Sequence, residues 1–264
     1  MQHALQWQGR IPAPSIPLET EPTVTIDGLS VSCLTRDELT AQLKTSLRRR
    51  TTSLFCYANV HAANVAHDDP DFLNVLNRSD VLYCDGMGLR YAGILLRRNI
   101  PQRIALTDWV DDVMSCAEQL RVRVYLLGGA EGVADAAAQR LRMRYPRLRI
   151  AGWHHGYLTD ESSAHIVREV NRLNVDLLIV GMGMPLQERW IARVFDQLPP
   201  ATILTAGSCL EYLSGNRSRC PMWMSRSGLE WLFRLLQEPR RLWRRYLIGN
   251  PRFLFRILLE RLSL

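Results

Sequence analysis

Asp176-Leu-Leu-Ile-Val-Gly-Met-Gly-Met-Pro-Leu-Gln-Glu-Arg-Trp190 is the stretch of sequence that decides the fold. Its apolar run, Leu177 to Val180, predicts a buried strand, and Gly181-Met-Gly183 predicts a tight turn after it. Pro185 then stands where a helix begins, because the first helical turn offers no partner for an N–H in any case. Such a turn gathers free backbone N–H groups that suit a phosphate or diphosphate. Glycines also close many turns that bind nothing, so both interpretations stay open.

Outward from this stretch, short apolar runs alternate with segments of helical length. The predicted strands cover 53–57, 81–84, 122–127, 148–152, 175–180 and 202–206. The predicted helices cover 35–49, 60–77, a segment ending near 97, 107–120, 132–144, 160–173 and 185–197. A hairpin with Asp27-Gly28 as its turn is predicted at 23–33. This order predicts a Rossmann-like α/β fold, with a parallel sheet and helices on both faces.

Three parts of the chain differ in composition. Residues 1–22 contain four prolines without periodicity and predict a flexible lead-in, 23–216 form the α/β domain, and 217–264 form a C-terminal appendage. The appendage has eleven arginines against three glutamates, with tryptophan, phenylalanine and leucine between them. Pro239 and Pro251 are expected to divide it into short helices. Basic amphipathic helices of this kind suit an anionic membrane surface, a solvated helical face or a nucleic-acid patch.

Length and composition indicate a soluble globular protein. The chain has 264 residues, of which 47% are hydrophobic and 22% charged, and its net charge is +7. Its six cysteines are scattered without a C-x-x-C pair, which predicts reduced core thiols and no zinc site. There is no signal-peptide pattern and no run of about 18 apolar residues. We therefore expect a cytoplasmic protein that can touch a membrane without crossing it.

Ligands of doubly wound sheets bind beyond the carboxyl ends of the strands. Candidates at these ends are Tyr57 and Asn59, Asp85, Gly128 and Gly129, and Gly181 and Gly183. Asp85 follows a strand within a glycine turn, where it can act as a general base or satisfy an Asx turn. Gln187 and Glu188, in the first turn of the following helix, are polar groups able to orient a ligand.

Other motifs are weaker. Asp69-Pro-Asp71 has the D-x-D form of a metal-diphosphate site, but Pro70 indicates a break or restart within a helix instead, so no metal site is predicted. The glycine turns do not complete G-x-G-x-x-G, which argues against a nicotinamide cofactor. His61 and the pair His154-His155 are expected to be structural. No cofactor is predicted.

Several motifs in order resemble the WecG/TagA/CpsF glycosyltransferases, from about Val24 to Phe253. They are Asp85-Gly86, Val124-Tyr-Leu-Leu-Gly-Gly129, Gly152-Trp-His-His-Gly-Tyr157, the stretch 181–190, and Gly228-Leu-Glu-Trp-Leu-Phe-Arg-Leu-Leu-Gln-Glu-Pro-Arg-Arg241. The resemblance implies an inverting, metal-independent transferase. Such an enzyme moves a sugar from a UDP-sugar to a polyprenyl-diphosphate-linked saccharide for a cell-surface polysaccharide, at the inner face of the cytoplasmic membrane.

The resemblance also assigns roles to residues. It implies that Asp85 is the base, that Asn59, Arg103 and Gln187 line the donor pocket, and that arginines of the appendage close over the site. The matching arginines are Arg234, Arg241 and Arg244. It implies no nucleic-acid partner and leaves a homo-oligomer open.

The sequence departs from the family pattern near the expected sugar pocket. Tyr57 stands where many members have threonine, and Leu106 replaces a usual glycine. Further changes lie in Gly207-Ser-Cys-Leu-Glu211 and in Arg219-Cys220-Pro221. The donor therefore stays open between UDP-glucose and UDP-N-acetylmannosamine or its uronic acid. The alternative to an enzyme is a non-catalytic nucleotide- or nucleic-acid-binding module.

Overall fold

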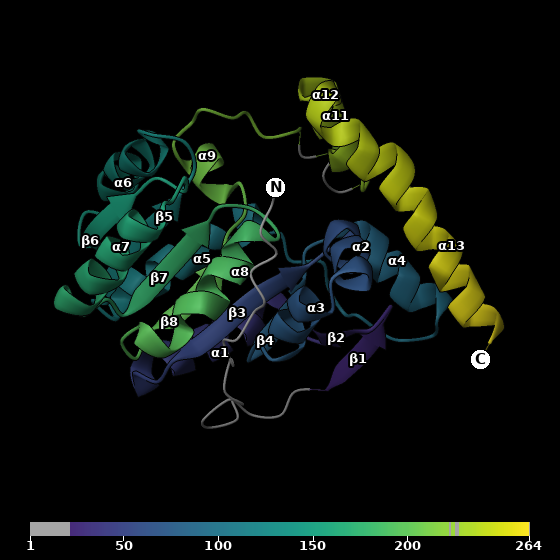
Figure 1. The fold of residues 1–264 in the computed structure, drawn as a ribbon, viewed down its shortest axis with the longest axis horizontal. Coiled ribbons are helices and arrows are strands. Elements are labelled where there is room, and N and C mark those ends of the chain that lie inside the picture. The colour runs from purple at the N-terminus through teal and green to yellow at the C-terminus, as the bar shows by residue number, and fades with distance from the viewer. Residues whose placement is uncertain (1–21, 222, 225–226, 264) are drawn as a thin grey trace.

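A six-stranded parallel sheet forms the centre of the protein (Figure 1). The structure is a computed structural model, and it describes residues 22–221, 223–224 and 227–263. The sheet runs in the order β4-β3-β8-β7-β5-β6, and every pair of neighbours is parallel. Its strands are β3 (Ser53–Ala58), β4 (Val81–Cys84), β5 (Arg123–Gly128), β6 (Arg149–His154), β7 (Leu177–Gly181) and β8 (Thr202–Thr205). The predicted parallel sheet is confirmed.

Helices cover both faces of the sheet. Successive residues of a strand point to opposite faces, so each face contributes its own apolar side chains. Phe55 and Tyr57 pack in one apolar cluster, and Leu54 and Cys56 pack in the other. The first face is covered by α1 (Arg36–Arg49), α5 (Leu106–Gln119), α6 (Val133–Arg144) and α9 (Cys209–Leu213). The second is covered by α2 (Val60–Asp68), α3 (Pro70–Asn77), α7 (Asp160–Arg172) and α8 (Leu186–Val194), which continues into η1 (Phe195–Gln197). The Rossmann-like arrangement is therefore as predicted.

The hairpin joins the second face. Its strands are β1 (Thr23–Ile26) and β2 (Leu29–Ser32), paired antiparallel. Asp27 and Gly28 have φ of 50° and 83°, the left-handed conformations that a two-residue hairpin turn requires. The hairpin prediction is confirmed.

The C-terminal segment packs along the second face as a set of consecutive helices. They are α11 (Glu230–Gln237), α12 (Pro239–Trp243), a π-helical turn η2 (Arg244–Ile248) and α13 (Gly249–Leu262). Figure 1 shows α13 running beside α2 and α4 (Met87–Leu95). Phe253 and Ile257 are buried in the same cluster as the hairpin. The Arg256 guanidinium pairs with the Asp27 carboxylate at 2.6 Å, and both side chains are nearly buried. This segment is consequently part of one packed body.

Several predicted boundaries shift. The helix predicted at 60–77 is two helices, because Asp69 caps the second one at Pro70, as the expected break indicated. The prediction that Thr107 caps a helix is wrong: α5 begins at Leu106 after Ala105, without a side-chain cap. Pro185 precedes α8 as its N-cap residue. Pro239 opens α12 as expected, whereas Pro251 lies in the first turn of α13, which it does not break.

All six cysteines are unpaired, and four of them (Cys56, Cys84, Cys116 and Cys209) are buried. The prediction of reduced thiols therefore agrees with the structure. The predicted lead-in, residues 1–22, lies outside the described residues except for Pro22. The boundary at 216/217 stays a prediction.

Candidate active site

Two strand ends meet closely at Asp85. The N–H of Asp85 donates to the Ala58 carbonyl oxygen at 2.8 Å, which ties the end of β4 to the end of β3. Gly86 permits this approach, since a Cβ at Gly86 would lie 2.9 Å from the Cβ of Asn59. Asn59 caps α2, because its side-chain oxygen accepts from the N–H groups of His61 and Ala62. Its amide nitrogen is then the atom that can donate to a ligand.

Asp85 lies in a charged but poorly solvated environment. Burial raises the pKa of Asp85 to about 8; the Glu230 carboxylate adds to the rise, and Arg103 and Arg234 oppose it. Arg103 pairs with Glu230 at 2.7 Å. The Arg103 loop is held at β4 by the N–H of Ile104, which donates to the Cys84 carbonyl. A carboxyl group with this pKa is suited to accept a proton near neutral pH.

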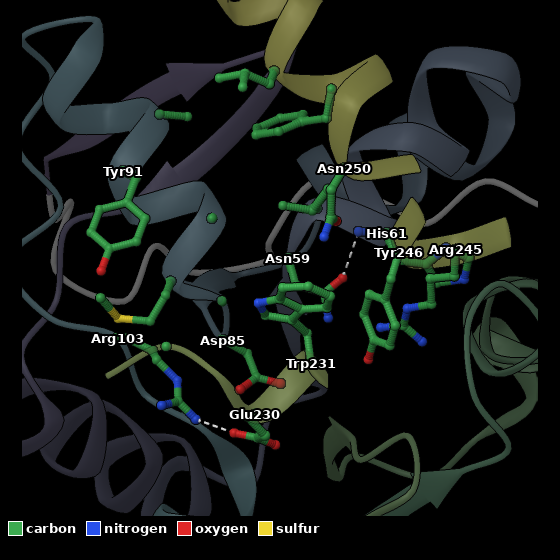
Figure 2. A pocket seen from close by; sticks show the side chains of 18 of the residues that line it. Asn59, His61, Asp85, Tyr91, Arg103, Glu230, Trp231, Arg245, Tyr246 and Asn250 are labelled. Carbon is green, nitrogen blue, oxygen red and sulfur yellow. Dashed lines mark hydrogen bonds and ion pairs between the residues drawn. The ribbon is translucent and has the colours of Figure 1, made fainter. Parts of the chain in front are cut away.

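Two cavities meet at this carboxylate. A polar cavity of about 380 Å³ lies over the ends of β3, β7 and β8, and an apolar cavity of about 410 Å³ lies between α4 and the C-terminal helices. Both volumes fall in the range of small-molecule sites. The residues that line both cavities are Asn59, His61, Asp85, Glu230, Arg234 and Arg245. Figure 2 shows most of them from the side of the apolar cavity, with Asp85 beside the Arg103–Glu230 pair.

The arginines of the C-terminal segment separate into two groups. Arg234 and Arg245 line both cavities, and Arg241 lines the polar one while its guanidinium bonds to the Glu238 carboxylate. Arg244, predicted as a site residue, is exposed, lines neither cavity and lies 5.3 Å from the ring centre of Trp243.

The sequence interpretation missed Arg245, although its spacing carries a signal. Positions 241 and 245 lie four residues apart in the consecutive turns of α12 and η2, a spacing that makes two side chains neighbours on a helix surface. Glu230, one turn before Arg234 on α11, was missed as well.

Arg234 and Arg245 are cations without an acidic partner. Among the described residues, no carboxylate lies within ion-pairing distance of either guanidinium, and each has a buried Nε that makes no hydrogen bond. Burial lowers the pKa of Arg245, and the charge of Arg234 lowers it further. Burial of the His61 ring, together with the positive charges of Arg245 and Arg234, lowers the pKa of His61 to about 4, so His61 is neutral at physiological pH. Two half-buried cations without an acidic partner favour an anionic ligand here.

Gln187 lies behind the polar cavity. It is fully buried, and its side-chain oxygen accepts from the N–H groups of Gly183 at 3.2 Å and Gly207 at 3.0 Å. Its amide nitrogen donates to the Glu188 carboxylate at 2.7 Å. Tyr57, which lines the cavity, lies close to the turn at Gly207, since a Cβ at Gly207 would lie 2.3 Å from its hydroxyl oxygen. Gln187 thus joins the turn after β7 to the turn after β8, and the Gly183 N–H is not free for a phosphate.

The other predicted glycines also lie behind the site. A Cβ at Gly128 would lie 2.3 Å from the Gly181 carbonyl oxygen, and one at Gly181 would lie 2.9 Å from that of Gly207. The Gly129 N–H donates to the Gly181 carbonyl. These glycines let the ends of β5, β7 and β8 pack together. Of the predicted glycines, Gly183 is the one that lines the polar cavity.

Replacing Gln187 with leucine tests this placement. The change leaves the buried Gly207 N–H without its acceptor and the buried Glu188 carboxyl group without its donor, each at a cost of about 1–3 kcal/mol. For a chain of this size, 1 kcal/mol shifts the unfolding temperature by roughly 2–4 °C. We expect the ligand-free variant to melt at least about 4 °C below the wild type, while Gln139→Leu, at an exposed position, melts normally. An unchanged melting temperature with weakened donor binding would instead make Gln187 a ligand contact.

The D-x-D motif lies away from the cavities. The Asp69 side chain accepts from the Phe72 N–H and pairs with Arg189 at 2.6 Å, so it serves the start of α3. Within the described residues, no cluster of three or more histidine, cysteine, aspartate or glutamate side chains has the arrangement of a metal site.

A Rossmann-like α/β fold with a carboxylate at a strand end, between two cavities of ligand size, is typical of an enzyme that acts on small molecules. The chain belongs to the WecG/TagA/CpsF glycosyl transferase family, whose model matches residues 24–264. It is therefore a glycosyltransferase.

Curated relatives agree with this membership. The chain is 30% identical over 202 residues to an N-acetylglucosaminyldiphosphoundecaprenol N-acetyl-beta-D-mannosaminyltransferase of Bacillus subtilis, covering 76% of this chain and 77% of the relative. It is 29% identical over 236 residues to the enzyme of the same name from Staphylococcus aureus, covering 89% and 91%.

Proposed function

We propose that this protein is an inverting glycosyltransferase that moves a sugar from a UDP-sugar to a hydroxyl group of a saccharide carried on a polyprenyl diphosphate. The observation that carries the proposal is the position of Asp85, where the polar and apolar cavities meet. The donor occupies the polar cavity, and the acceptor saccharide enters from the apolar one. The names of the curated relatives, which include a diphosphoundecaprenol acceptor, support this choice of acceptor.

The reaction follows from this arrangement. The Asp85 carboxylate accepts the proton of the acceptor hydroxyl, and the oxygen forms a bond to the anomeric carbon of the donor sugar. The bond from that carbon to the diphosphate oxygen breaks, and its electron pair leaves with UDP. Because attack and departure occur on opposite faces of the carbon, the anomeric configuration inverts.

Arginines stabilise the leaving group in this proposal. Negative charge develops on the diphosphate as the bond breaks, and Arg234, Arg241 and Arg245 line the cavity in which it lies. Charge-assisted hydrogen bonds from guanidinium groups are suited to this role. With these cations supplying the charge stabilisation, we expect transfer to continue in the presence of a chelator.

The residues that depart from the family pattern bear on which donor sugar the protein accepts. Tyr57 and Leu106 both line the polar cavity, where the family pattern has smaller residues. A donor screen tests the proposal: UDP-glucose, UDP-N-acetylmannosamine and its uronic acid are each incubated with N-acetylglucosaminyl diphosphoundecaprenol. We expect one of them to give a glycosylated lipid and free UDP. UDP release that does not depend on the lipid, or no UDP binding at all, would contradict the proposal.

The C-terminal helices supply a surface that fits a membrane. Leu247, Ile248, Leu259 and Leu262 are 48–83% exposed, in the same segment as the exposed Arg240 and Arg244. Within the described part of the chain, no helix is both long and apolar enough to cross a bilayer. Exposed apolar side chains beside arginines favour binding at the interface of an anionic membrane.

Vesicle flotation tests this surface. Each leucine inserted into the interface contributes up to about 1.5–3 kcal/mol. We expect Leu259→Glu combined with Leu262→Glu to weaken binding to vesicles containing anionic lipid by at least about tenfold, because the loss of one such contact has an effect of this size. Met143→Glu, at an exposed apolar position on α6, should bind as the wild type does. Equal losses in the two variants would disprove the assignment of the surface.

A further inference from the structure

The apolar cavity extends beyond the groups that sugar transfer requires. Its far part lies between α4 and α13, and is lined by Tyr91, Ala92, Leu95, Phe253, Leu254 and Ile257. None of these side chains can exchange a proton with a hydroxyl group near neutral pH or neutralise a phosphate. An exclusively polar acceptor would leave this part of the cavity unused.

The cavity is polar at one end and apolar at the other. Helix α4 begins at Met87, two residues after Asp85, and ends at Leu95. At 1.5 Å per residue, Leu95 lies roughly 12 Å along the helix axis from Met87. Arg234 and Arg245 line the polar end, near Asp85. Figure 2 shows Tyr91 on the α4 side of this space, above Asp85. Such a shape fits an amphiphile whose reacting sugar and diphosphate precede an apolar chain.

The apolar end opens beside exposed apolar side chains. Tyr91 and Leu254 line the cavity and are nevertheless 54% and 53% exposed. Ile94 and Leu258, on the same two helices, are also exposed. Several exposed apolar side chains beside a cavity indicate a binding site, whereas a single exposed leucine does not. Tyr91 and Leu254, which both line the cavity and are exposed, join the apolar end to the protein surface.

We propose that the cavity between α4 and α13 binds the prenyl units nearest the diphosphate of the acceptor lipid. The identity of this ligand rests on the proposed function. Binding there draws the first part of the prenyl chain out of the bilayer and fixes the distance between the lipid diphosphate and Asp85. The cavity thus contributes to acceptor selection as well as to membrane contact.

Calorimetric titration of the full chain with soluble probes tests the proposal without a membrane. The probes are geranyl diphosphate and methyl diphosphate, which differ in the apolar chain alone. Each buried CH₂ group contributes roughly a fourfold gain in affinity. We expect geranyl diphosphate to bind at least about 60-fold more tightly to the wild type, from burial of three or more such groups.

A matched pair of variants locates the effect. Leu254→Glu places a carboxylate at the cavity wall and should reduce the preference for the geranyl chain to less than about fivefold, since the chain loses its apolar contact. Phe255→Glu makes the same charge change one residue away, at an exposed position that does not line the cavity, and should retain the preference.

Equal affinities of the two probes for the wild type would overturn the proposal, as would equal losses in the two variants. The proposed function fails separately. If geranyl diphosphate binds more tightly than methyl diphosphate but no UDP-sugar supports sugar transfer, the cavity assignment is supported and the proposed transfer is contradicted.

Discussion

Replacing Asp85 with asparagine is expected to lower kcat by about 10³-fold, within the range that a general base contributes. The amide keeps the size of the carboxyl group but cannot accept the proton of the acceptor hydroxyl. UDP binding should persist, because the substitution leaves in place the arginines that line the polar cavity, Arg234, Arg241 and Arg245. Steady-state transfer kinetics and calorimetry with UDP measure the two effects.

The folded protein should tolerate this substitution. Burial raises the pKa of Asp85 to about 8, so the folded state holds the proton more tightly than the unfolded chain does. Between the ordinary pKa of an aspartate and about 8, deprotonation in the unfolded chain therefore lowers the stability of the fold. An asparagine lacks this penalty, so its melting temperature at pH 7 should equal or exceed that of the wild type.

The same carboxylate determines the pH dependence of the wild type. The base acts when deprotonated, and its pKa lies near 8 in the folded protein. We expect kcat/KM to rise about tenfold per pH unit below that value and to level off above it. Near-normal turnover in Asp85→Asn, or a profile that is flat between pH 5 and 8, would remove Asp85 from the role of base.

The fold could be predicted because the chain repeats local signals that agree with one another. Apolar runs of strand length end in glycine turns, and helices such as α1 begin with a capping box that the structure contains. The position of Asp85 at the cavities could be predicted for the same reason, since strand ends of a parallel sheet share one edge, whereas its role as base stays a proposal. Where a single local signal stood alone, as at Thr107, the prediction was wrong.

The interior of the site could not be predicted from local signals. Gln187 follows the glycine turn in sequence, which suggests a ligand contact. Its hydrogen-bond partners, however, include the N–H of Gly207 in the turn after β8, and that contact arises only when β7 and β8 lie side by side. Long-range packing likewise decides that Gly128 and Gly181 serve the approach of backbones. A glycine motif alone does not separate packing from binding.

The arginines of the C-terminal segment could not be assigned from local signals either, and one of them gives the second prediction with a large expected effect. Replacing Arg245 with methionine is expected to lower kcat by about 10²–10³-fold, the usual effect of removing one donor that stabilises developing charge. Arg245 lines both cavities, and its buried Nε makes no hydrogen bond with any residue that the structure describes. Methionine retains an apolar stem of similar length. Single-turnover kinetics with saturating donor would report the loss directly.

Arg244→Met is the matched control, because Arg244 is its neighbour in sequence, carries the same charge and lines neither cavity. We expect this variant to retain kcat within about twofold, as exposed substitutions usually do. Arg245→Met should not unfold the protein, since burial and the charge of Arg234 already disfavour the Arg245 cation. A large loss in Arg244→Met with normal activity in Arg245→Met would reverse the assignment and would favour the residue that the family resemblance indicated. Loss in Arg245→Met alone would mean that the leaving diphosphate meets a cation from η2, a turn that lies 160 residues beyond Asp85 in the chain (245 − 85).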